Sequence, residues 1–209
     1  MKKMSQTRSF PAYIFVNVEP GYMSRAIEEL KREAHVDFIA PTTGRFDIAI
    51  RTRATNTDQI YRTIRQIRSI PGIRSAVTQF VSDGFQSERF PESGFPMGIA
   101  LIKVNGATNS GSTTAESFES TFEKISRLPG LVEAYAGPGN FDIVAAFQSR
   151  SLEDIAKIAV EKLSNVDGIY QSETLIAPYT LVRGPGRFTR TAQGNFPNSA
   201  IEATGFTGK

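Results

Sequence analysis

The sequence of 209 residues contains no cysteine and only one histidine, His35. Without cysteine the chain cannot form disulfides or thiolate metal sites, and nothing in it suggests an oxidising compartment. A single histidine also excludes metal sites that need two histidines from one chain. No apolar run approaches the roughly 20 residues of a membrane helix, and no signal peptide is evident. We therefore expect a cytoplasmic protein without a membrane segment, a resident metal or a cofactor.

The net charge of +3 hides an uneven distribution along the chain. Residues 1–82 contain 13 Lys and Arg against 7 Asp and Glu, whereas residues 98–182 contain 6 against 10. Halves of opposite sign favour attraction between the halves, or between chains, over one continuous nucleic-acid surface.

Three segments of the first half recur in the second half in the same order. The matches are residues 12–18 with 98–104, 44–48 with 139–143, and 72–73 with 168–169, at offsets of 86, 95 and 96. The offset grows by nine where residues 105–112 (NGATNSGS) indicate an enlarged loop. The chain is therefore predicted to contain two copies of one structural unit.

Hydrophobic periodicity predicts the same elements in both copies. Apolar residues recur at helical spacing in four segments: Met23, Ile27, Leu30 and Ala34; Ile60, Ile64, Ile67 and Ile70; Phe118, Phe122 and Ile125; Leu152, Ile155, Ala159 and Leu163. Thr113-x-x-Glu116 and Ser151-x-x-Asp154 form capping boxes at two helix starts. Strand pairs are predicted at residues 36–40 with 46–52, and at 131–136 with 141–148.

The predicted order in each copy is strand, helix, strand, strand, helix, strand, which is the ferredoxin-like β-α-β-β-α-β arrangement of the α+β class. The predicted organisation is an N-terminal arm (1–11), a first domain (12–82), a linker (83–97), a second domain (98–182) and a flexible basic tail (183–209). The linker is rich in Gly, Pro and Ser, and the tail lacks periodicity.

The first strand of each copy is apolar on both faces. Tyr13 and Phe15 alternate with Ile14 and Val16, and residues 98–104 repeat this pattern. Two helices cover only one face of a four-stranded sheet, so the other face would leave a large apolar patch in water. We expect the sheet of one copy to pack on another copy, within the chain or between chains, as in a dimeric α/β barrel.

Short motifs then connect the chain to a known family. They are Val18-Glu19-Pro20-Gly21, Gly44-x-Phe46-Asp47 and Ser69-Ile70-Pro71-Gly72-Ile73 in the first copy, and Leu128-Pro129-Gly130-Leu131-Val132, Gly139-Asn140-Phe141-Asp142 and Val166-Asp167-Gly168-Ile169 in the second. Their ordered recurrence resembles tandem ligand-binding (RAM) domains of the Lrp/AsnC transcription regulators, over about four fifths of the chain. His35 stands where the second copy has Gly130, so the two copies differ in detail.

The resemblance implies a domain that pairs through its sheets, oligomerises, and binds an amino acid or similar effector at subunit interfaces near the glycine-aspartate turn. By resemblance the ligand-binding residues are Gly44, Arg45, Asp47, Gly139, Asn140 and Asp142. Full regulators also carry an N-terminal helix-turn-helix, whereas about eleven residues precede the first predicted strand here. Direct sequence-specific DNA binding is not expected, but association with full-length regulators is.

Other interpretations of the same residues remain open. The glycines can simply supply the turns and the aspartates cap them. Asp47 and Asp142 can instead form a carboxylate pair for acid-base chemistry, as in a dimeric α/β-barrel enzyme. His35 can be a haem ligand, although a surface or hairpin position is favoured. We predict a non-catalytic protein that binds an effector and oligomerises.

Basic residues form one further candidate surface. Arg62, Arg65 and Arg68 lie at three-residue spacing on the second predicted helix. We expect Arg51, Arg53 and Arg74 to lie near them. A solvated face, or a contact with the acidic second copy, is favoured over nonspecific nucleic-acid binding.

Overall fold

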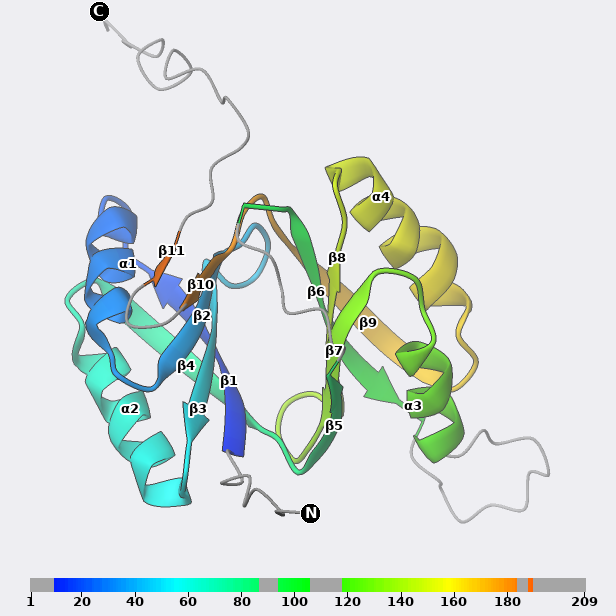
Figure 1. The fold of residues 1–209 in the computed structure, drawn as a ribbon, viewed down its shortest axis with the longest axis horizontal. Helices are drawn as coiled ribbons and strands as arrows, with labels where there is room; N and C mark the ends of the chain where they lie inside the picture. Colours follow the sequence, from blue (N-terminus) through cyan, green and yellow to red (C-terminus); the bar gives the residue numbers. More distant parts are fainter. Residues whose placement is uncertain (1–9, 87–93, 106–117, 184–187, 190–209) are drawn as a thin grey trace, which may run out of the picture.

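The computed structural model describes residues 10–86, 94–105, 118–183 and 188–189. Two antiparallel sheets lie face to face, and helices cover the outer face of each sheet (Figure 1). Each sheet is built mainly from one of the two copies that the sequence repeat predicts. The expected α+β class, with two ferredoxin-like units packed through their sheets, is confirmed.

The first copy folds in the predicted order of elements. These are β1 (Phe10–Val18), α1 (Met23–Arg32), β2 (Val36–Pro41), β3 (Ile48–Ala54), α2 (Thr57–Ser69) and β4 (Ile73–Phe80). The strands lie in the order β2-β3-β1-β4. β3 begins two residues later than predicted, because Phe46 and Asp47 belong to the turn that precedes it.

The second copy repeats this arrangement. Its elements are β6 (Met97–Val104), α3 (Phe118–Ser126), β7 (Leu131–Ala136), β8 (Ile143–Gln148), α4 (Leu152–Lys157) and β9 (Ile169–Ala177). The strand order β7-β8-β6-β9 matches that of the first copy. The register of β1 on β4 shifts between Asn17 and Val18, and that of β6 on β9 shifts between the equivalent Lys103 and Val104. The repeat therefore extends to the irregularities of the sheets.

The copies exchange short strands that the sequence did not predict. β5 (Asp83–Gln86) follows the first copy but pairs with β7 of the second. β10 (Leu181–Arg183) follows the second copy but pairs with β2 of the first, and β11 (Phe188–Thr189) pairs with β10. Part of the predicted linker and the start of the predicted tail are thus ordered strands. The guanidinium of Arg183 donates to the backbone oxygens of Val36 and Glu33, both at 2.7 Å.

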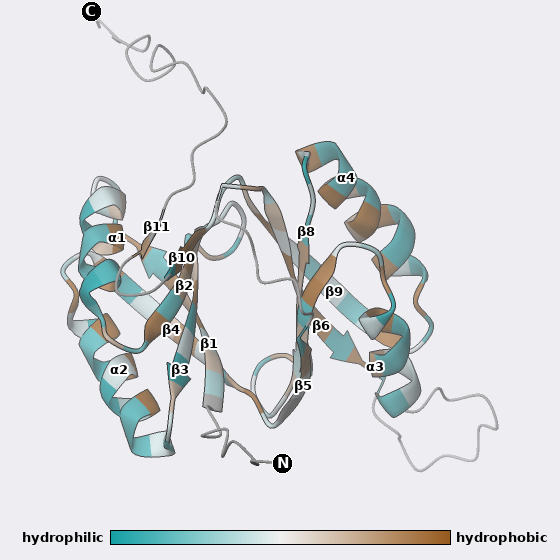
Figure 2. Cartoon of the chain, viewed as in Figure 1, coloured by the Kyte–Doolittle hydropathy of each residue, from teal (hydrophilic) through white to brown (hydrophobic). Residues whose placement is uncertain are grey.

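The space between the sheets is filled by apolar side chains from both copies. Tyr13 and Phe15 of β1 and Ile99 and Leu101 of β6 belong to this cluster, whereas Ile14 faces the helices of its own copy. Apolar positions mark the strands as well as the inner faces of the helices (Figure 2). The prediction that both strand faces are buried is confirmed, and the covering sheet comes from the same chain.

Helix starts and turns follow local chemistry. The Ser151 hydroxyl accepts a hydrogen bond from the Asp154 amide at 3.1 Å, so the predicted N-cap is confirmed, while the Asp154 carboxylate accepts from the Ser149 hydroxyl at 2.9 Å. The predicted box at Thr113 lies outside the described residues. After α4 the chain continues as a π-helix (Ile158–Lys162) and a 3-10 turn (Leu163–Asn165). The wider π turn buries Ile158 and leaves Ala159 half-buried, which simple helical spacing did not predict.

No helix among the described residues is long and apolar enough to cross a bilayer.

Candidate functional site

A cavity of about 540 Å³ opens where the hairpin turns of the two copies meet at one end of the space between the sheets. This volume is within the usual range for small-molecule sites. It is lined by Asn17, Arg45, Phe46, Ser75, Val77, Leu101, Lys103, Gly139, Asn140, Phe141, Gln171 and Glu173. Residues of both predicted ligand sites, Arg45 from the first copy and Gly139 and Asn140 from the second, therefore line one cavity.

The lining residues are related by the internal repeat. Five pairs occupy equivalent positions in the two copies: Asn17 with Lys103, Arg45 with Asn140, Phe46 with Phe141, Ser75 with Gln171, and Val77 with Glu173. The strand registers agree, because Asn17 faces Ser75 across β1 and β4 as Lys103 faces Gln171 across β6 and β9. The cavity thus lies on the pseudo-two-fold axis that relates the copies, but its charged groups are not symmetric.

Arg45 is the central charged residue of this site. Its guanidinium lies 3.0 Å from the Glu173 carboxylate. The same group lies 5.0 Å from the centre of the Phe46 ring and 5.3 Å from that of Phe141, within cation-π range. The Lys103 side chain is exposed at the rim. The cavity therefore offers two cations, one anion and two aromatic faces.

Three of the six predicted ligand-binding residues, Arg45, Gly139 and Asn140, line the cavity. Gly44 has a φ of +116°, a left-handed conformation that strongly favours glycine. A Cβ on Gly139 would lie 2.1 Å from the side-chain oxygen of Gln79. Gly44 is therefore favoured by the turn conformation, whereas Gly139 leaves room for the Gln79 side chain of the first copy.

Asp47 and Asp142 hold the turns against the first strand of each copy. The Asp47 carboxylate accepts a hydrogen bond from the Val18 amide at 2.7 Å, and that of Asp142 accepts one from the Val104 amide at 2.9 Å. These bonds agree with the turn-capping interpretation. Neither aspartate lines the cavity between the copies, so a direct ligand contact by either stays a prediction.

The comparisons with known proteins agree with this architecture. A family model described as the Lrp/AsnC ligand binding domain matches residues 11–89 and again residues 100–186. The chain belongs to this family. The resemblance inferred from the sequence motifs is confirmed, and the two matches coincide with the two copies of this Lrp/AsnC ligand-binding domain protein.

Curated relatives of this Lrp/AsnC family member are similar over one segment. An uncharacterized HTH-type transcriptional regulator of Pyrococcus furiosus is 28% identical over 82 residues, which are 39% of this chain and 52% of the relative. Another from Pyrococcus horikoshii has the same identity and coverage. The chain spans about half the length of the curated relatives that it matches.

Solved structures with the same fold are distant in sequence. The siroheme decarboxylase NirDL has a TM-score of 0.58 at 9% identity, covering 80% of this chain and 70% of that one. A variant chlorite dismutase from Candidatus Nitrospira defluvii, solved with cyanide, has a TM-score of 0.55 at 13% identity, covering 84% and 92%. These similarities establish the fold that the Lrp/AsnC family member shares with them.

The sequence did not predict that a buried glutamine, Gln79, joins the two copies next to this site. The Gln79 side chain, only 2% exposed, donates from Nε2 to the Gly137 oxygen at 2.6 Å and accepts from the Phe141 amide at 3.3 Å. Gln79 belongs to the first copy and Gly137 and Phe141 to the second. A polar residue in the inward register of an apolar strand was the available signal.

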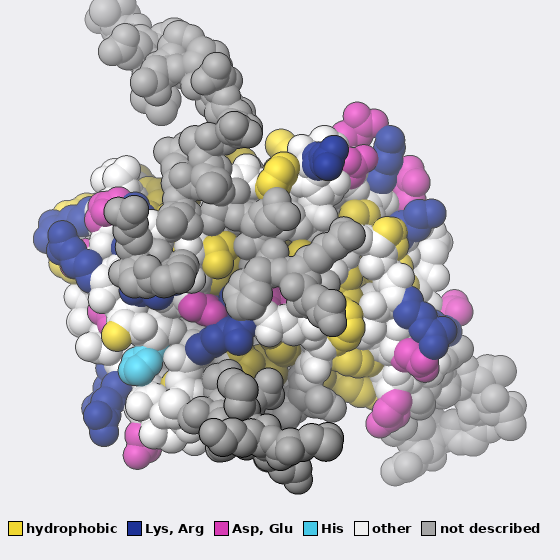
Figure 3. Space-filling model, in the orientation of Figure 1, with side chains coloured by type: hydrophobic (Ala, Val, Ile, Leu, Met, Phe, Trp, Pro, Cys, Tyr) yellow, Lys and Arg dark blue, Asp and Glu magenta, His cyan; other side chains and the backbone are white. Residues whose placement is uncertain are grey.

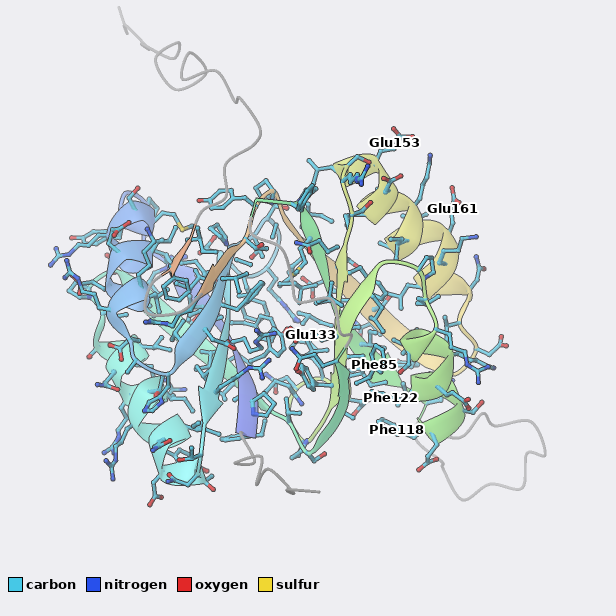
Figure 4. The ribbon with its side chains drawn as sticks, viewed as in Figure 1. Phe85, Phe118, Phe122, Glu133, Glu153 and Glu161 are labelled. Carbon is cyan, nitrogen blue, oxygen red and sulfur yellow. The ribbon has the colours of Figure 1, made fainter. Side chains whose placement is uncertain are left out.

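The prediction that Arg51 belongs to a basic surface is wrong. Its side chain is 0% exposed and pairs with Glu133 of the second copy, which is 1% exposed. Glu133 lies on β7 and points into the space between the sheets (Figure 4). Two further bonds, at 2.9 and 3.1 Å, join the guanidinium to the Asp37 carboxylate. The hydroxyls of Tyr13 and Tyr135 both donate to Glu133. A charged residue in a strand predicted a solvent-exposed side chain. Arg51 is buried instead, because the carboxylates of Asp37 and Glu133 both pair with its guanidinium.

This buried cluster gives a pH-dependent prediction. Burial, and then the Glu133 carboxylate, raise the pKa of Tyr13 well above 10.0, and the same two causes raise the pKa of Tyr135. In the unfolded chain both hydroxyls ionise near pH 10, so above that pH the folded state binds more protons than the unfolded state. Stability is therefore expected to fall as pH rises from about 10.

Urea unfolding between about pH 8 and 11 measures this fall. The loss per pH unit should be smaller in Tyr13→Phe and Tyr135→Phe, and unchanged in Tyr170→Phe, whose side chain is 72% exposed. Equal slopes in all four proteins would contradict the assignment.

The predicted helix arginines are exposed, as expected. Arg62, Arg65 and Arg68 lie on α2, and Arg68 donates to the Ala76 oxygen of β4 at 3.0 Å. Lys and Arg side chains lie along the outer edges of both copies, and Asp and Glu side chains are interspersed with them on the second copy (Figure 3). A nucleic-acid or partner contact by these residues stays a prediction.

His35 lies in the turn between α1 and β2, next to residues of α1 and α2. It lines a hollow of about 390 Å³ with Arg32, Glu33 and Arg62, away from the cavity between the copies. This position agrees with a surface or hairpin histidine. Among the described residues, no cluster of three or more His, Asp or Glu is arranged to hold a metal ion.

Proposed function

We propose that the protein is a non-catalytic effector-binding module that takes one amino acid, or a similar zwitterion, in the cavity between its copies. The observation that carries this proposal is the half-exposed Arg45–Glu173 pair, with its groups 3.0 Å apart, at the mouth of a 540 Å³ cavity. Family membership supports a ligand-binding role in a regulatory context.

The chemistry of the pair selects the class of ligand. An amino acid carries a carboxylate and an ammonium group, so it can satisfy Arg45 and Glu173 together while separating them. A simple carboxylic acid would bind Arg45 but leave Glu173 unpaired, which costs free energy. Phe46 and Phe141 supply apolar faces for the ligand side chain.

The geometry also predicts the stoichiometry. Because the cavity lies on the pseudo-two-fold axis, both glycine turns contribute to the same site. One ligand per chain is expected, although the chain has two copies of the domain. Further assembly into oligomers stays a prediction. As long as the two sheet faces of one chain cover each other, it would use other surfaces.

A thermal-shift screen of the twenty amino acids, followed by calorimetry of the best binder, tests this function. Stabilisation should grow with ligand concentration, reaching about 2.7 kcal/mol at 100 times Kd. Arg45→Ala should weaken binding by roughly tenfold or more, the usual value of a charged hydrogen bond. Arg65→Ala, an exposed change on α2, is the matched control and should leave Kd unchanged.

Comparison with the deaminated analogue of the same binder sharpens the test. It should bind more weakly than the amino acid to the wild type, and this preference should shrink in Glu173→Gln. Two ligands per chain, or equal affinity in Arg45→Ala, would contradict the assigned site. No stabilisation by any amino acid would contradict the proposed ligand class.

A further inference from the structure

The buried Arg51–Glu133 pair joins the two sheets at one point. Arg51 comes from β3 of the first copy and Glu133 from β7 of the second, and both are almost completely buried. Glu133 also accepts from Tyr13 across the sheets and from Tyr135 of its own strand. Unpaired charges are costly in such a place, so the position of each partner matters.

The internal repeat shows that this contact is made once and not twice. Phe38 faces Arg51 across β2 and β3, and Glu133 faces Ala146 across β7 and β8. Glu133 therefore occupies the position equivalent to Phe38, and Ala146 the position equivalent to Arg51. Where a symmetric pair would have a second ion pair, this chain has two apolar residues.

Like copies would consequently be poor partners. Two second copies packed face to face would bury each Glu133 against an alanine, with only the Tyr135 hydroxyl left as a donor. Two first copies would bury each Arg51 against a phenylalanine, with Asp37 as its remaining partner. Both arrangements lose the pairing of Arg51 with Glu133: Glu133 is left without a cationic partner, and Arg51 keeps only Asp37. The loss of this buried pair acts against both arrangements.

We propose that the Arg51–Glu133 pair is a recognition code on the sheet faces: a first-copy face accepts a second-copy face, from its own or another chain, and rejects its own kind. The surface then fits a partner that presents a carboxylate at the position of Glu133. Any assembly of this protein through its sheets would be an exchange between first and second copies. This inference does not depend on the proposed ligand.

Charge reversal tests the code in the full chain. Two chains are prepared, one with Arg51→Glu and one with Glu133→Arg, and both carry Asp37→Asn so that the new carboxylate at position 51 does not meet a second one. Each chain alone has a like-charge pair between its sheets and should melt roughly 10 °C or more below the Asp37→Asn parent. A chain with both reversals has the opposite charges restored and should recover most of that loss.

Mixing the two single-reversal chains distinguishes recognition from simple stability. An exchanged pair of chains matches one reversed ion pair and one native ion pair, so the mixture should give a dimer of twice 22.9 kDa by light scattering. The matched control mixes Arg45→Glu with Glu173→Arg, the half-exposed pair between the copies, and should give no such dimer.

Rescue in the double-reversal chain supports the pairing of a first-copy face with a second-copy face, and a dimer in the mixture extends this recognition to faces from different chains. The code is overturned if a single-reversal chain melts like its parent. It is also overturned if neither the double reversal nor the mixture recovers stability beyond the single-reversal chains.

Discussion

Glu133→Leu is expected to lower the free energy of unfolding by about 3 to 5 kcal/mol, the usual cost of removing one partner from a buried ion pair. The change leaves the Arg51 guanidinium buried with only Asp37, and it deprives Tyr13 and Tyr135 of their acceptor. Urea unfolding followed by far-ultraviolet circular dichroism measures the loss.

The double variant Arg51→Leu/Glu133→Leu separates the cost of an unmatched charge from the contribution of the pair. Removing both charges should cost less than Glu133→Leu alone, because no charge stays buried without its cross-sheet partner. Glu161→Leu, an exposed change in the second copy, is the control and should stay within about 0.5 kcal/mol of wild type. If the losses from Arg51→Leu and Glu133→Leu simply add up to the loss in the double variant, the two residues do not act as a pair.

Phe15→Ala is expected to cost about 3 to 5 kcal/mol, the range for truncating a buried aromatic residue. Phe15 is 0% exposed, and its ring lies 5.9 Å from that of Tyr13, 5.3 Å from Phe46 and 6.1 Å from Phe141. Because Phe141 belongs to the second copy, the truncation opens a void in the contact between the sheets.

Equilibrium unfolding of Phe15→Ala should also show whether the copies unfold together. One transition, shifted to lower urea, is expected if the sheets form a single cooperative core. Tyr170→Ala, whose side chain is 72% exposed, is the aromatic control and should have little effect. A Phe15→Ala protein as stable as this control would mean that the inter-sheet cluster contributes little to stability.

The architecture places within one chain a contact that the family resemblance implies between chains. Tandem copies allow the two faces to diverge, because each position of the pseudo-dimer is encoded separately. Arg45 and Asn140, at equivalent positions of one cavity, show this divergence, as do Arg51 and Ala146. A single cavity with different charged groups from the two copies is the consequence.

Much of the fold could be predicted because it follows from local patterns. Alternation at Tyr13 and Phe15 predicted strands buried on both faces, and the Ser151 capping box marked the start of α4 correctly. The strand exchange could not be predicted in this way. β5, which contains Phe85, has only four residues and lies in a Gly- and Ser-rich stretch, so local patterns do not predict it. It forms a strand only because β7 offers a free edge.

The candidate site was predicted in part. The glycine-aspartate motifs singled out Arg45, Gly139 and Asn140, which line the cavity, while their contact with a ligand stays a prediction. Gln79 and Glu173 were missed because they come from the last strands of the copies, far from these motifs in sequence. Their roles depend on which strand edges meet across the pseudo-two-fold axis.

By itself the sequence determined the duplicated unit, its order of elements and the need to cover two apolar sheet faces, since periodicity and turn chemistry act over a few residues. Only the tertiary structure decided that the faces cover each other within one chain, that residues of both hairpin turns line one cavity, and that Arg51 is buried. These features arise from contacts between residues about 80 or more positions apart, such as Arg51 and Glu133, and their energies depend on what each charge meets once water is excluded.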